Sequence, residues 1–525
     1  MSHPRIIIIG AGPTGLGAAY RLRELGHTNF MMYEKHPYLG GLAHSFTDPA
    51  GFTWDIGGHV MFSHYTYYDQ VFDRLMGSDF TWNDRESWVR TQGRWVPYPF
   101  QNNIRHLPPQ ACYECLSGLI KAQIGSQIGS QIGSQSGTGK VARHQDAANF
   151  GEFIDAVFGE GIARHFMRPY NFKVWAHPPE MMNKQWIGER VAVIDVERAL
   201  RNVVLGTDDF GWGPNNRFKF PLKGGTGEFY SRFGPHIQGN YELSRSVVSV
   251  DVDAKTVTLD DGRIDHYDHL ITAMPLDILC RDVLKGRVPD TIRATAQRLR
   301  HSSGYMVGLG IRRPCPSTKS WMYFPDADSP FYRVTYLSNY SPFMTPEPYT
   351  TAPDGRRNGS FYSLLCETSA SEFKPVDESA IVEDTIRGLI SSGLMTEDER
   401  ADVVSTWTYK AAYSYPTPTV DRDEILSSVI PWLESRAIFS RGRFGMWKYE
   451  VANTDHTLMQ GVEVVNRLLK GEPETTIGVV YKVTEDGRHA ADHERPNVAG
   501  SGEKRLASTV EPKPNGQHVR EHRTK

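Results

Sequence analysis

The chain has 525 residues, of which 39% are hydrophobic and 23% are charged, a composition typical of globular proteins. Its 58 lysines and arginines face 61 aspartates and glutamates, which leaves a net charge of −3. This balance argues against a nucleic-acid partner and against an anionic-membrane surface, because both favour a marked excess of positive charge. A single hydrophobic core stops growing below this length, so two or three domains are expected.

The five cysteines are few, odd in number and mostly dispersed, which favours a reducing compartment over a disulfide framework. Cys112 and Cys115 have CxxC spacing, but no second CxxC completes a four-ligand zinc site, so no metal is expected. The N-terminal "MSHPRIIIIGAG" has too short an apolar run for a signal peptide, and no run of 18 apolar residues occurs. A cytoplasmic protein without a membrane span is therefore expected.

The N-terminal segment predicts a strand, a glycine turn, a helix and a second strand. In "RIIIIGAGPTGLGAAYRLRELG" four isoleucines precede the glycines, and apolar residues then recur at helical spacing. The second strand is predicted over "NFMMYEK" (29–35). Residues 104–205 look mainly helical, interrupted by "IGSQIGSQIGSQSGTG" (124–139). This repeat has no face that builds a core, so a flexible surface insertion is predicted.

Strand patterns return over residues 217–275 and again over 303–345, bounded by turn-forming residues. Residues 378–395 and 458–471 carry amphipathic helical patterns. Beyond about residue 483 no Phe, Tyr or Trp occurs, and charged residues, proline and glycine dominate. The tail 483–525 is therefore predicted to be disordered.

Gly10, Gly12 and Gly15 form a GxGxxG motif between the first predicted strand and helix. Such glycines let the backbone turn tightly and approach a pyrophosphate, whose charge is met by the helix N-terminus. Glu34 ends the second strand, 19 residues beyond Gly15. A carboxylate there accepts hydrogen bonds from ribose hydroxyls and repels a 2′-phosphate, which favours FAD or NAD over NADP. The alternative is a Rossmann-like helix that holds no ligand.

The stretch "WDIGGHVMFSHY" (54–65) packs two glycines, two histidines and several aromatic residues into twelve positions. Its apolar residues fit neither a helical stripe nor a strand alternation. Taken alone, it predicts a glycine-rich turn with a hydrogen-bonded histidine.

The order of GxGxxG, Glu34 and "YLGGLAHS" (38–45) resembles the FAD-binding family that includes amine oxidases, phytoene desaturases and UDP-galactopyranose mutases. Rab GDP-dissociation inhibitors share this fold without being enzymes, so the fold alone does not establish catalysis. Longer strings, over about residues 5–470, resemble the eukaryotic-type UDP-galactopyranose mutases. They are "GGHVMFSHY", "WVPYPFQNNI", "FMRPYNFKVWA", "WIGERV", "WGPNNRFKFPLKGGTG", "PFYRVTYLSNYSP", "YPTPT" and "RGRFGMWKYEVANTDH". "NTDH" departs from the family's "NQDH" at Thr454.

The resemblance implies an α/β fold built from three parts. A discontinuous, Rossmann-like FAD-binding domain is expected over 1–103, 217–300 and 440–482. An inserted, mainly helical domain is expected over 104–216, and an antiparallel β-sheet substrate domain over 301–439.

The implied activity is a flavin-dependent isomerase (an intramolecular transferase) that converts UDP-galactopyranose to UDP-galactofuranose without net redox change. It would supply galactofuranose for glycoconjugates. N5 of reduced FAD would attack the anomeric carbon and expel UDP, while the protein supplies binding, orientation and charge. Because the flavin must first be reduced, NADPH or NADH is expected as a transient partner in the substrate cleft. The oligomeric state stays open, a homo-oligomer included.

The implied substrate pocket holds a nucleotide-sugar. Arg333 and Arg443 would bind the diphosphate, since guanidinium groups match phosphate geometry. Tyr98 and Phe166 would sandwich the uracil, although an aromatic beside proline is more often a packing residue. The other substrate-binding residues implied are Gln101, Asn171, Trp175, Arg190, Asn215, Trp321, Tyr323, Tyr415, Tyr449 and Asn453.

"GGHVMFSHY" resembles the family's histidine loop, which lies against the isoalloxazine ring. Gly57 and Gly58 would change conformation when flavin N5 gains a proton, and His59 would move with them. Phe62 would wall the pocket, and the segments of Arg190 and Asn215 resemble two mobile flaps. The catalytic residues implied are Gly58, His59, Arg190 and Arg333.

The implied cofactor site extends well beyond the glycine motif. The helix that begins near residues 455–457 would stabilise the anionic reduced flavin by up to about 1 kcal/mol. The cofactor-binding residues implied are Gly10, Gly12, Pro13, Thr14, Gly15, Glu34, Lys35, Gly40, Gly41, Leu42, Gly57, Gly58, Val247, Arg443, Asn453, Asp455, His456 and Thr457.

Two alternatives remain open at this point. An amine oxidase or desaturase of the same fold would need an apolar or amine-binding cleft, which fits poorly with Arg190, Arg333 and Arg443. A non-catalytic binding protein like the GDP-dissociation inhibitors would hold no flavin.

Overall fold

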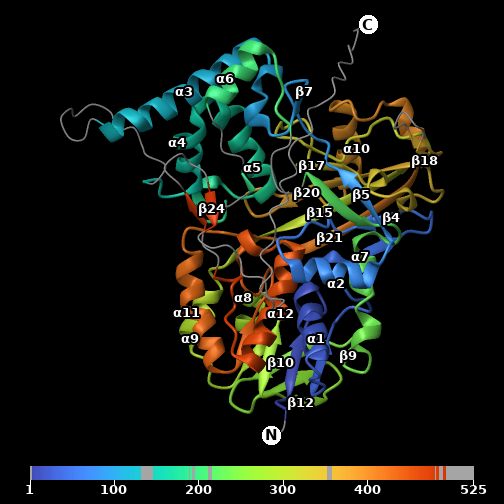
Figure 1. Ribbon diagram of the computed structural model, residues 1–525, viewed down its shortest axis with the longest axis vertical. Helices are drawn as coiled ribbons and strands as arrows, with labels where there is room; N and C mark the ends of the chain where they lie inside the picture. The colour runs from blue at the N-terminus through green and yellow to red at the C-terminus, as the bar shows by residue number, and fades with distance from the viewer. Residues whose placement is uncertain are drawn as a thin grey trace.

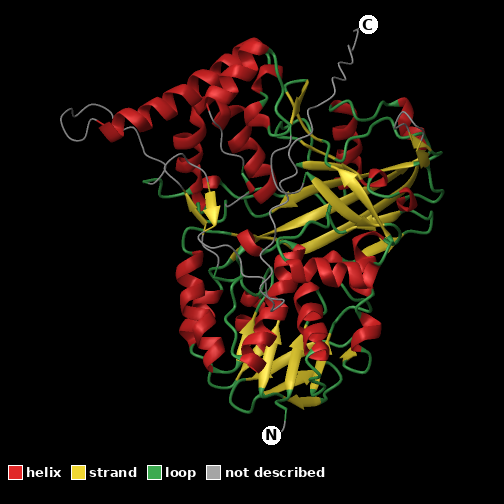
Figure 2. Cartoon of the chain, in the orientation of Figure 1, coloured by secondary structure: helices red, strands yellow, loops and turns green. Residues whose placement is uncertain are grey.

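The computed structural model describes residues 3–131, 146–187, 190–191, 196–210, 216–351, 357–478, 481–483 and 489–491. Its lower part in Figure 1 is a sheet covered by helices. Above this part lie a group of helices on one side and a large twisted sheet on the other. The two sheets and the helical group are also distinguished by secondary structure in Figure 2.

The lower sheet has five parallel strands in the order β22-β13-β1-β2-β9. Every residue of β1 is buried, as predicted from its four consecutive isoleucines, because both faces of the sheet are covered. The strands are β1 (Ile6–Ile9), β2 (Phe30–Tyr33), β9 (Tyr241–Glu242), β13 (His269–Thr272) and β22 (Ile438–Ser440).

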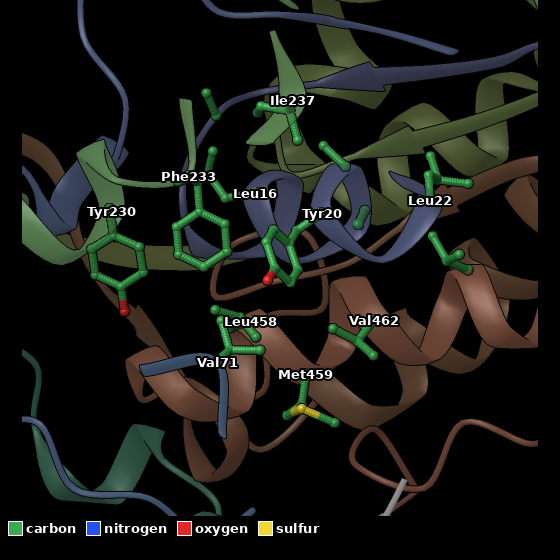
Figure 3. Close-up of a cluster of buried hydrophobic side chains, with 14 of the residues drawn as sticks. Leu16, Tyr20, Leu22, Val71, Tyr230, Phe233, Ile237, Leu458, Met459 and Val462 are labelled. Atoms are coloured by element: carbon green, nitrogen blue, oxygen red, sulfur yellow. The ribbon is translucent and has the colours of Figure 1, made fainter. Parts of the chain in front are cut away.

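One face of this sheet is covered by helices from both ends of the chain. Leu16 and Tyr20 of α1 (Pro13–Glu24) pack beside Leu458 and Val462 of α12 (Thr454–Lys470), as Figure 3 shows. The same apolar cluster takes in α2 and α7, so four helices form one layer. Their bounds are Thr66–Met76 for α2 and Gly225–Ser231 for α7.

The other face of the sheet supports a second apolar cluster with a small four-stranded sheet and helices. That sheet has the order β12-β11-β10-β14. Its strands are β10 (Val247–Asp251), β11 (Thr256–Leu259), β12 (Ile264–His266) and β14 (Leu284–Lys285). The helices are α8 (Leu276–Ile278), α9 (Asp290–Ala296) and α11 (Arg422–Ser435).

The large upper sheet has seven strands in the order β21-β15-β20-β17-β16-β6-β7. Its pairs are antiparallel except for β16 with β6. The strands are β6 (Ser87–Thr91), β7 (Arg94–Pro97), β15 (Arg300–Ile311), β16 (Trp321–Tyr323), β17 (Arg333–Tyr336), β20 (Tyr362–Ala370) and β21 (Val403–Thr417). Helix α10 (Ile381–Ser391) packs on this sheet.

This pairing corrects the boundaries expected from the sequence at two places. Residues 87–97 were expected in the nucleotide-binding part, but β6 and β7 extend the upper sheet, because β16 offers β6 a parallel edge. Residues 422–435 were expected in the substrate part, but α11 buries its apolar face against the lower sheet.

The predicted helical region contains α3 (Pro109–Gln131), α4 (Phe150–Ile162), α5 (Arg168–Trp175) and α6 (Val196–Leu205). Helix α3 continues through residues 124–131, where a flexible insertion was predicted. The prediction is wrong there because a helix that is already nucleated gains one hydrogen bond per added residue. Residues 132–139 of the repeat lie outside the described residues.

Four short pairs of strands complete the structure. They are β3 (Ser45–Thr47) with β4 (Thr53–Asp55), β5 (Phe80–Asp84) with β8 (Arg217–Pro221), β18 (Thr350–Thr351) with β19 (Arg357–Asn358), and β23 (Tyr481–Val483) with β24 (His489–Ala491). The β23–β24 pair contradicts the predicted disorder at 489–491, because backbone pairing needs no apolar composition. The remaining tail lies outside the described residues. Among the described helices, none is long and apolar enough to cross a membrane.

Candidate active site

The glycine motif forms the turn between β1 and α1, where it was predicted. Gly10 adopts a φ of +96°, and a Cβ on Gly15 would lie 1.9 Å from the Gly10 carbonyl oxygen. Only glycine fits at Gly15, because a side chain there would overlap the turn. Pro13 occupies the first turn of α1, and Thr14 follows it in the buried part of the helix.

Glu34 lies at the carboxyl end of β2, beside the glycine turn. Its Oε2 accepts a hydrogen bond from the Ala11 N–H at 2.7 Å, and its Oε1 accepts one from the His36 N–H at 2.8 Å. Gly40 donates its N–H to the Ala11 carbonyl at 2.8 Å. Glu34 and Gly40 therefore both lie against the glycine turn at Ala11, as a dinucleotide site requires.

The other predicted cofactor residues take different positions around this turn. Gly41 and Leu42 begin the short helical turn after Gly40, and Lys35 is exposed directly after Glu34. Val247 is buried at the start of β10.

The N-terminus of α12 is occupied by contacts with the 54–65 stretch. Asp455 accepts hydrogen bonds from Nδ1 of His64 at 2.7 Å and from its backbone N–H at 3.0 Å. Burial alone would raise the pKa of Asp455, but His456 and His64 hold it well below its ordinary value. The His64 ring also stacks on His456, with centroids 4.5 Å apart. Thr457 donates its hydroxyl to the Asn453 carbonyl.

The glycines of the histidine loop differ in conformation. Gly57 has a φ of +88° and donates its N–H to the Asp55 carbonyl, whereas Gly58 is not in the left-handed region. The Gly58 N–H donates to Oε1 of Glu367 at 3.2 Å. Burial lowers the pKa of His59 to about 4, and Arg333 adds to this effect, so the imidazole is neutral at pH 7. Its Nδ1 is buried without a hydrogen-bond partner in the described structure.

Glu367 is the main site residue that the sequence analysis missed. Its Oε1 accepts from Nε of Arg333 at 2.5 Å and its Oε2 from Nη2 at 2.7 Å. The Tyr332 hydroxyl donates to the same carboxylate at 2.9 Å. A lone carboxylate in the otherwise uncharged and buried strand "YSLLCETSA" was the available signal.

Arg333 is therefore held in an ion pair, a partner that the predicted diphosphate role did not include. Burial opposes its charge, but the Glu367 carboxylate raises the pKa of Arg333 well above its ordinary value. Nη1 takes no part in this ion pair. Arg333 is thus a fixed cation that joins β17 to β20 and, through Glu367, to Gly58.

Arg443 and Arg190 are cations of a different kind, since neither forms an ion pair with a described carboxylate. Arg443 donates from Nε and Nη2 to the Ser414 carbonyl, at 3.1 and 2.9 Å, and from Nη1 to the Ala452 carbonyl at 3.2 Å. Burial lowers the pKa of Arg443, and the nearby Arg190 adds to the effect. Such an uncompensated pair of cations favours an anionic ligand.

A group of aromatic rings surrounds these two arginines. The Tyr449 ring lies 4.8 Å from the Arg190 guanidinium carbon and 5.5 Å from that of Arg443. Tyr415 lies 5.0 Å from Arg443, and Trp175 packs edge-on against Tyr449 at 4.7 Å. These predicted substrate residues do come together in the structure.

The position of Arg190 is fixed by the turn that follows Tyr449. Its Nη1 donates to the Glu450 carbonyl at 2.7 Å, and its Nη2 donates to Oδ1 of Asn453 at 3.2 Å. The Glu450 carboxylate is in turn held by Arg422 through two hydrogen bonds, of 2.8 and 2.9 Å. Asn215, the residue expected on the second flap, lies outside the described residues.

The uracil sandwich expected from Tyr98 and Phe166 stays a prediction, and both rings contact other aromatic rings of the protein. Phe166 is buried and stacks on Phe100 at 4.4 Å and on Tyr170 at 5.2 Å, so its ring packs against protein rings. Tyr98 lies 5.3 Å from the Tyr323 ring. The motif alone could not separate a ligand platform from core packing.

Tyr98 lines a cavity of about 250 Å³ together with residues of β6, the two residues between β5 and β6, and residues that precede β8. The other lining residues are Arg85, Glu86, Ser87, Trp88, Phe210 and Asn216. The Arg85 guanidinium lies 5.5 Å from the Tyr98 ring centre.

Three further predicted residues lie around Tyr323 and in the helical part. Trp321 donates its indole N–H to the Tyr323 hydroxyl at 2.6 Å. Asn171 of α5 donates its side-chain N–H at 2.7 Å to the carbonyl of Met167, the residue directly before this helix. Gln101 is buried near Met167.

Comparison with known proteins shows the family and the fold of the chain. Residues 13–461 match the model of the flavin containing amine oxidoreductases. A crystal structure of reduced UDP-galactopyranose mutase is 44% identical with a TM-score of 0.82, covering 91% of this chain and 96% of that chain. A CLA-producing fatty acid isomerase from P. acnes has 16% identity and a TM-score of 0.58, covering 89% of this chain and 100% of that chain, which shows a shared fold.

Among curated sequences, polyamine oxidase 1 of Zea mays is 39% identical over 56 residues, 11% of each chain. The chain therefore spans about a tenth of that relative. The α/β architecture predicted from the sequence is confirmed by the family match and the long structural match. The chain belongs to the flavin containing amine oxidoreductase family and, within it, to the UDP-galactopyranose mutases.

Proposed function

We propose that the protein converts UDP-galactopyranose to UDP-galactofuranose, with FAD as its resident cofactor. The observation that carries this proposal is the pair Arg443 and Arg190, two cations without a described carboxylate partner, set among tyrosines. Such a pair of cations suits the diphosphate of a nucleotide-sugar and disfavours the amine cation that an amine oxidase binds. The 44% identity to a UDP-galactopyranose mutase over 91% of the chain supports the same activity.

The residues of the lower sheet fit FAD. The glycine turn leaves the nearest atom 4.0 Å from a Cβ placed on Gly12, and α1 begins directly at this turn. A pyrophosphate can therefore approach the backbone N–H groups there. Glu34 stands beside the turn to accept the ribose hydroxyls, so Gly12 and Glu34 would hold the dinucleotide. Once reduced, FAD supplies at N5 the nucleophile for the anomeric carbon of the sugar.

The protein's own part in the reaction is to bind, orient and neutralise charge. Arg443 and Arg190 bind the diphosphate and stabilise the negative charge that grows on UDP as it leaves. Arg333 adds a fixed cation whose position depends on Glu367. His59, neutral at pH 7, can accept or donate a single hydrogen bond beside the reacting sugar without adding charge.

A nicotinamide donor, NADPH or NADH, would reduce the enzyme before turnover. The proposed location is the cytoplasm, since the five cysteines are all free and four of them are buried. The three-part division into nucleotide-binding, helical and sheet domains is also part of this proposal, and the separate apolar clusters of the lower sheet, the helices and the upper sheet support it.

The test is to purify the full chain, measure its flavin, reduce it with dithionite and supply UDP-galactofuranose. We expect a yellow protein whose reduced form yields UDP-galactopyranose on chromatography, while the oxidised form yields little. Hydrogen peroxide release with an amine substrate would instead indicate an oxidase. A colourless protein that stays inactive after added FAD would indicate a binding protein.

A further inference from the structure

Asp55 is a fully buried carboxylate directly before the histidine loop, and the proposed reaction does not use it. Its Oδ1 accepts from the Ser45 hydroxyl at 2.5 Å and from the Thr226 N–H at 3.1 Å. Its Oδ2 accepts from the Thr226 hydroxyl at 2.7 Å. Burial raises the pKa of Asp55 to about 6, while these donors favour its ionised form, so the group is a carboxylate at neutral pH.

This arrangement joins three segments that are distant in the sequence. Ser45 begins β3, Asp55 ends β4, and Thr226 is the second residue of α7. The Ser45 hydroxyl also accepts the N–H of Gly227 at 2.8 Å. A Cβ on Gly225, which has a φ of +63°, would lie 2.4 Å from Oδ1 of Asp55, so the start of α7 approaches Asp55 as closely as glycine allows.

The histidine loop is fixed at both ends by a single continuous stretch of chain. At the start of the loop, the Asp55 carboxylate accepts a hydrogen bond from the Thr226 hydroxyl, and the Asp55 carbonyl accepts one from the N–H of Gly57. At its end, Met61 exchanges two backbone hydrogen bonds of 3.0 Å with Lys219 of β8. Residues 219–226 therefore hold both ends of the loop, and the intervening residues include Gly58 and His59.

The position of Gly58 matters because its N–H donates to the carboxylate that holds Arg333. Gly58, Glu367 and Arg333 are linked by hydrogen bonds of 3.2, 2.5 and 2.7 Å. A shift of the loop start by a fraction of an ångström would change the contact between Gly58 and Glu367, because interiors are packed too densely to absorb it. The start of the histidine loop is thus linked to Arg333 through hydrogen bonds of Gly58 and Glu367.

We propose that Asp55 is a positioning residue for the mutase reaction: with Ser45 and Thr226 it fixes the start of the histidine loop, so that His59 and the Gly58–Glu367–Arg333 linkage are held in place. The proposal rests on the function proposed above. Asp55 itself touches neither substrate nor cofactor in this role, and acts through Gly57 and Gly58.

The experiment compares Asp55→Asn, Thr226→Val and Thr226→Ser in the FAD-loaded, full-length protein. Asp55→Asn keeps the size of the side chain but replaces an acceptor oxygen with a donor, and Thr226→Val removes one hydroxyl. We expect kcat after full reduction to fall about tenfold to a hundredfold for both, because small misplacements of reacting groups cost this much. Thr226→Ser, which keeps the hydroxyl, should restore most of the activity.

Asp48→Asn is the matched control, because Asp48 braces the other end of the same β3–β4 hairpin. Its carboxylate accepts from the Phe52 N–H at 3.0 Å and from the Trp54 indole at 2.8 Å, away from the loop. We expect Asp48→Asn to lower the melting temperature while kcat per bound flavin stays at the wild-type value. The Asp55 and Thr226→Val variants should in addition shift the midpoint potential of the flavin, which loss of stability alone does not move.

The possible results separate this inference from the proposed function. If the wild-type, reduced protein does not convert UDP-galactofuranose, the proposed function itself is wrong. If the wild type is active but Asp55→Asn and Thr226→Val retain its kcat and flavin potential, the positioning role is refuted. Equal loss of kcat in Asp48→Asn would also refute it, since any weakening of the hairpin would then suffice.

Discussion

Arg333 and Glu367 are joined by two hydrogen bonds, from Nε at 2.5 Å and from Nη2 at 2.7 Å, in a site where the Glu367 side chain is 2% exposed. Breaking a buried ion pair from one side leaves an uncompensated charge. We therefore expect Glu367→Gln to lower the free energy of unfolding by about 3 to 5 kcal/mol. It should also lower kcat/KM, because Arg333 loses the partner that fixes its position.

Chemical denaturation and steady-state kinetics of Glu367→Gln check this expectation. Glu378→Gln is the control, since Glu378 forms an exposed pair with Lys410, and its denaturation midpoint should match that of the wild type. Wild-type stability in Glu367→Gln would show that the pair contributes little.

Removal of Arg443 should weaken nucleotide binding without changing flavin content. Its guanidinium is held by two backbone carbonyls and two tyrosine rings, so it is available to an anion. Arg443→Ala should weaken UDP binding by about 2 to 5 kcal/mol, and Arg443→Lys by less than Arg443→Ala, because lysine keeps the charge but not the planar fork. Isothermal titration with UDP measures this. Arg313→Ala, in an exposed pair, should leave the affinity unchanged.

Gly58→Ala should slow turnover more than it disturbs FAD binding. A Cβ at Gly58 would lie 2.8 Å from the Thr335 hydroxyl, so the loop must shift. Combining it with Thr335→Ala removes that contact and should restore the melting temperature. If the loop also needs the conformational freedom of Gly58, kcat stays low in the double variant. Full recovery of kcat would reduce the role of Gly58 to a steric one.

His59 predicts a specific pH dependence of stability. Its pKa is about 4 in the folded protein, against 6.5 in the reference state. The unfolded chain therefore binds a proton first as the pH falls, and stability is lost between pH 6.5 and 4. Between pH 7.5 and 4.5 this group should remove about 2 to 3 kcal/mol.

Urea denaturation of the wild type and His59→Gln at both pH values isolates this contribution. The wild type should lose more stability than His59→Gln on acidification. Identical losses would mean that His59 is accessible to protons in the folded state.

The sequence was sufficient for the parts of the fold that are set by local physics. Four isoleucines before GxGxxG predicted a buried strand and a tight turn, and both are present. The isoleucines are buried in the strand, and Gly10 adopts the positive φ of the turn. Glu34 was found for the same reason, since the end of a second strand fixes its place beside the turn. Arg443, Tyr415 and Tyr449 were predicted through resemblance to share one site, and the structure places them next to one another.

The residues that were missed depend on contacts between distant segments. Glu367 lies 34 residues from Arg333 in the chain, and strand pairing alone makes them neighbours. The role of Phe166 as a ligand platform stays a prediction, and its stacking on Phe100 and Tyr170 could not be predicted because it depends on how the helices pack. The helix over 124–131 could not be read from a repeat with no apolar face, because its helical state is propagated from the preceding turns.

The proposed reaction involves no net redox change, and the flavin stays reduced throughout. The most direct measurement reduces the enzyme anaerobically with one equivalent of dithionite, adds excess UDP-galactofuranose, and follows both the flavin absorbance and the products. We expect many molecules of UDP-galactopyranose per flavin while the flavin remains bleached. Product limited to one molecule per flavin, with the yellow colour returning as it forms, would contradict this expectation.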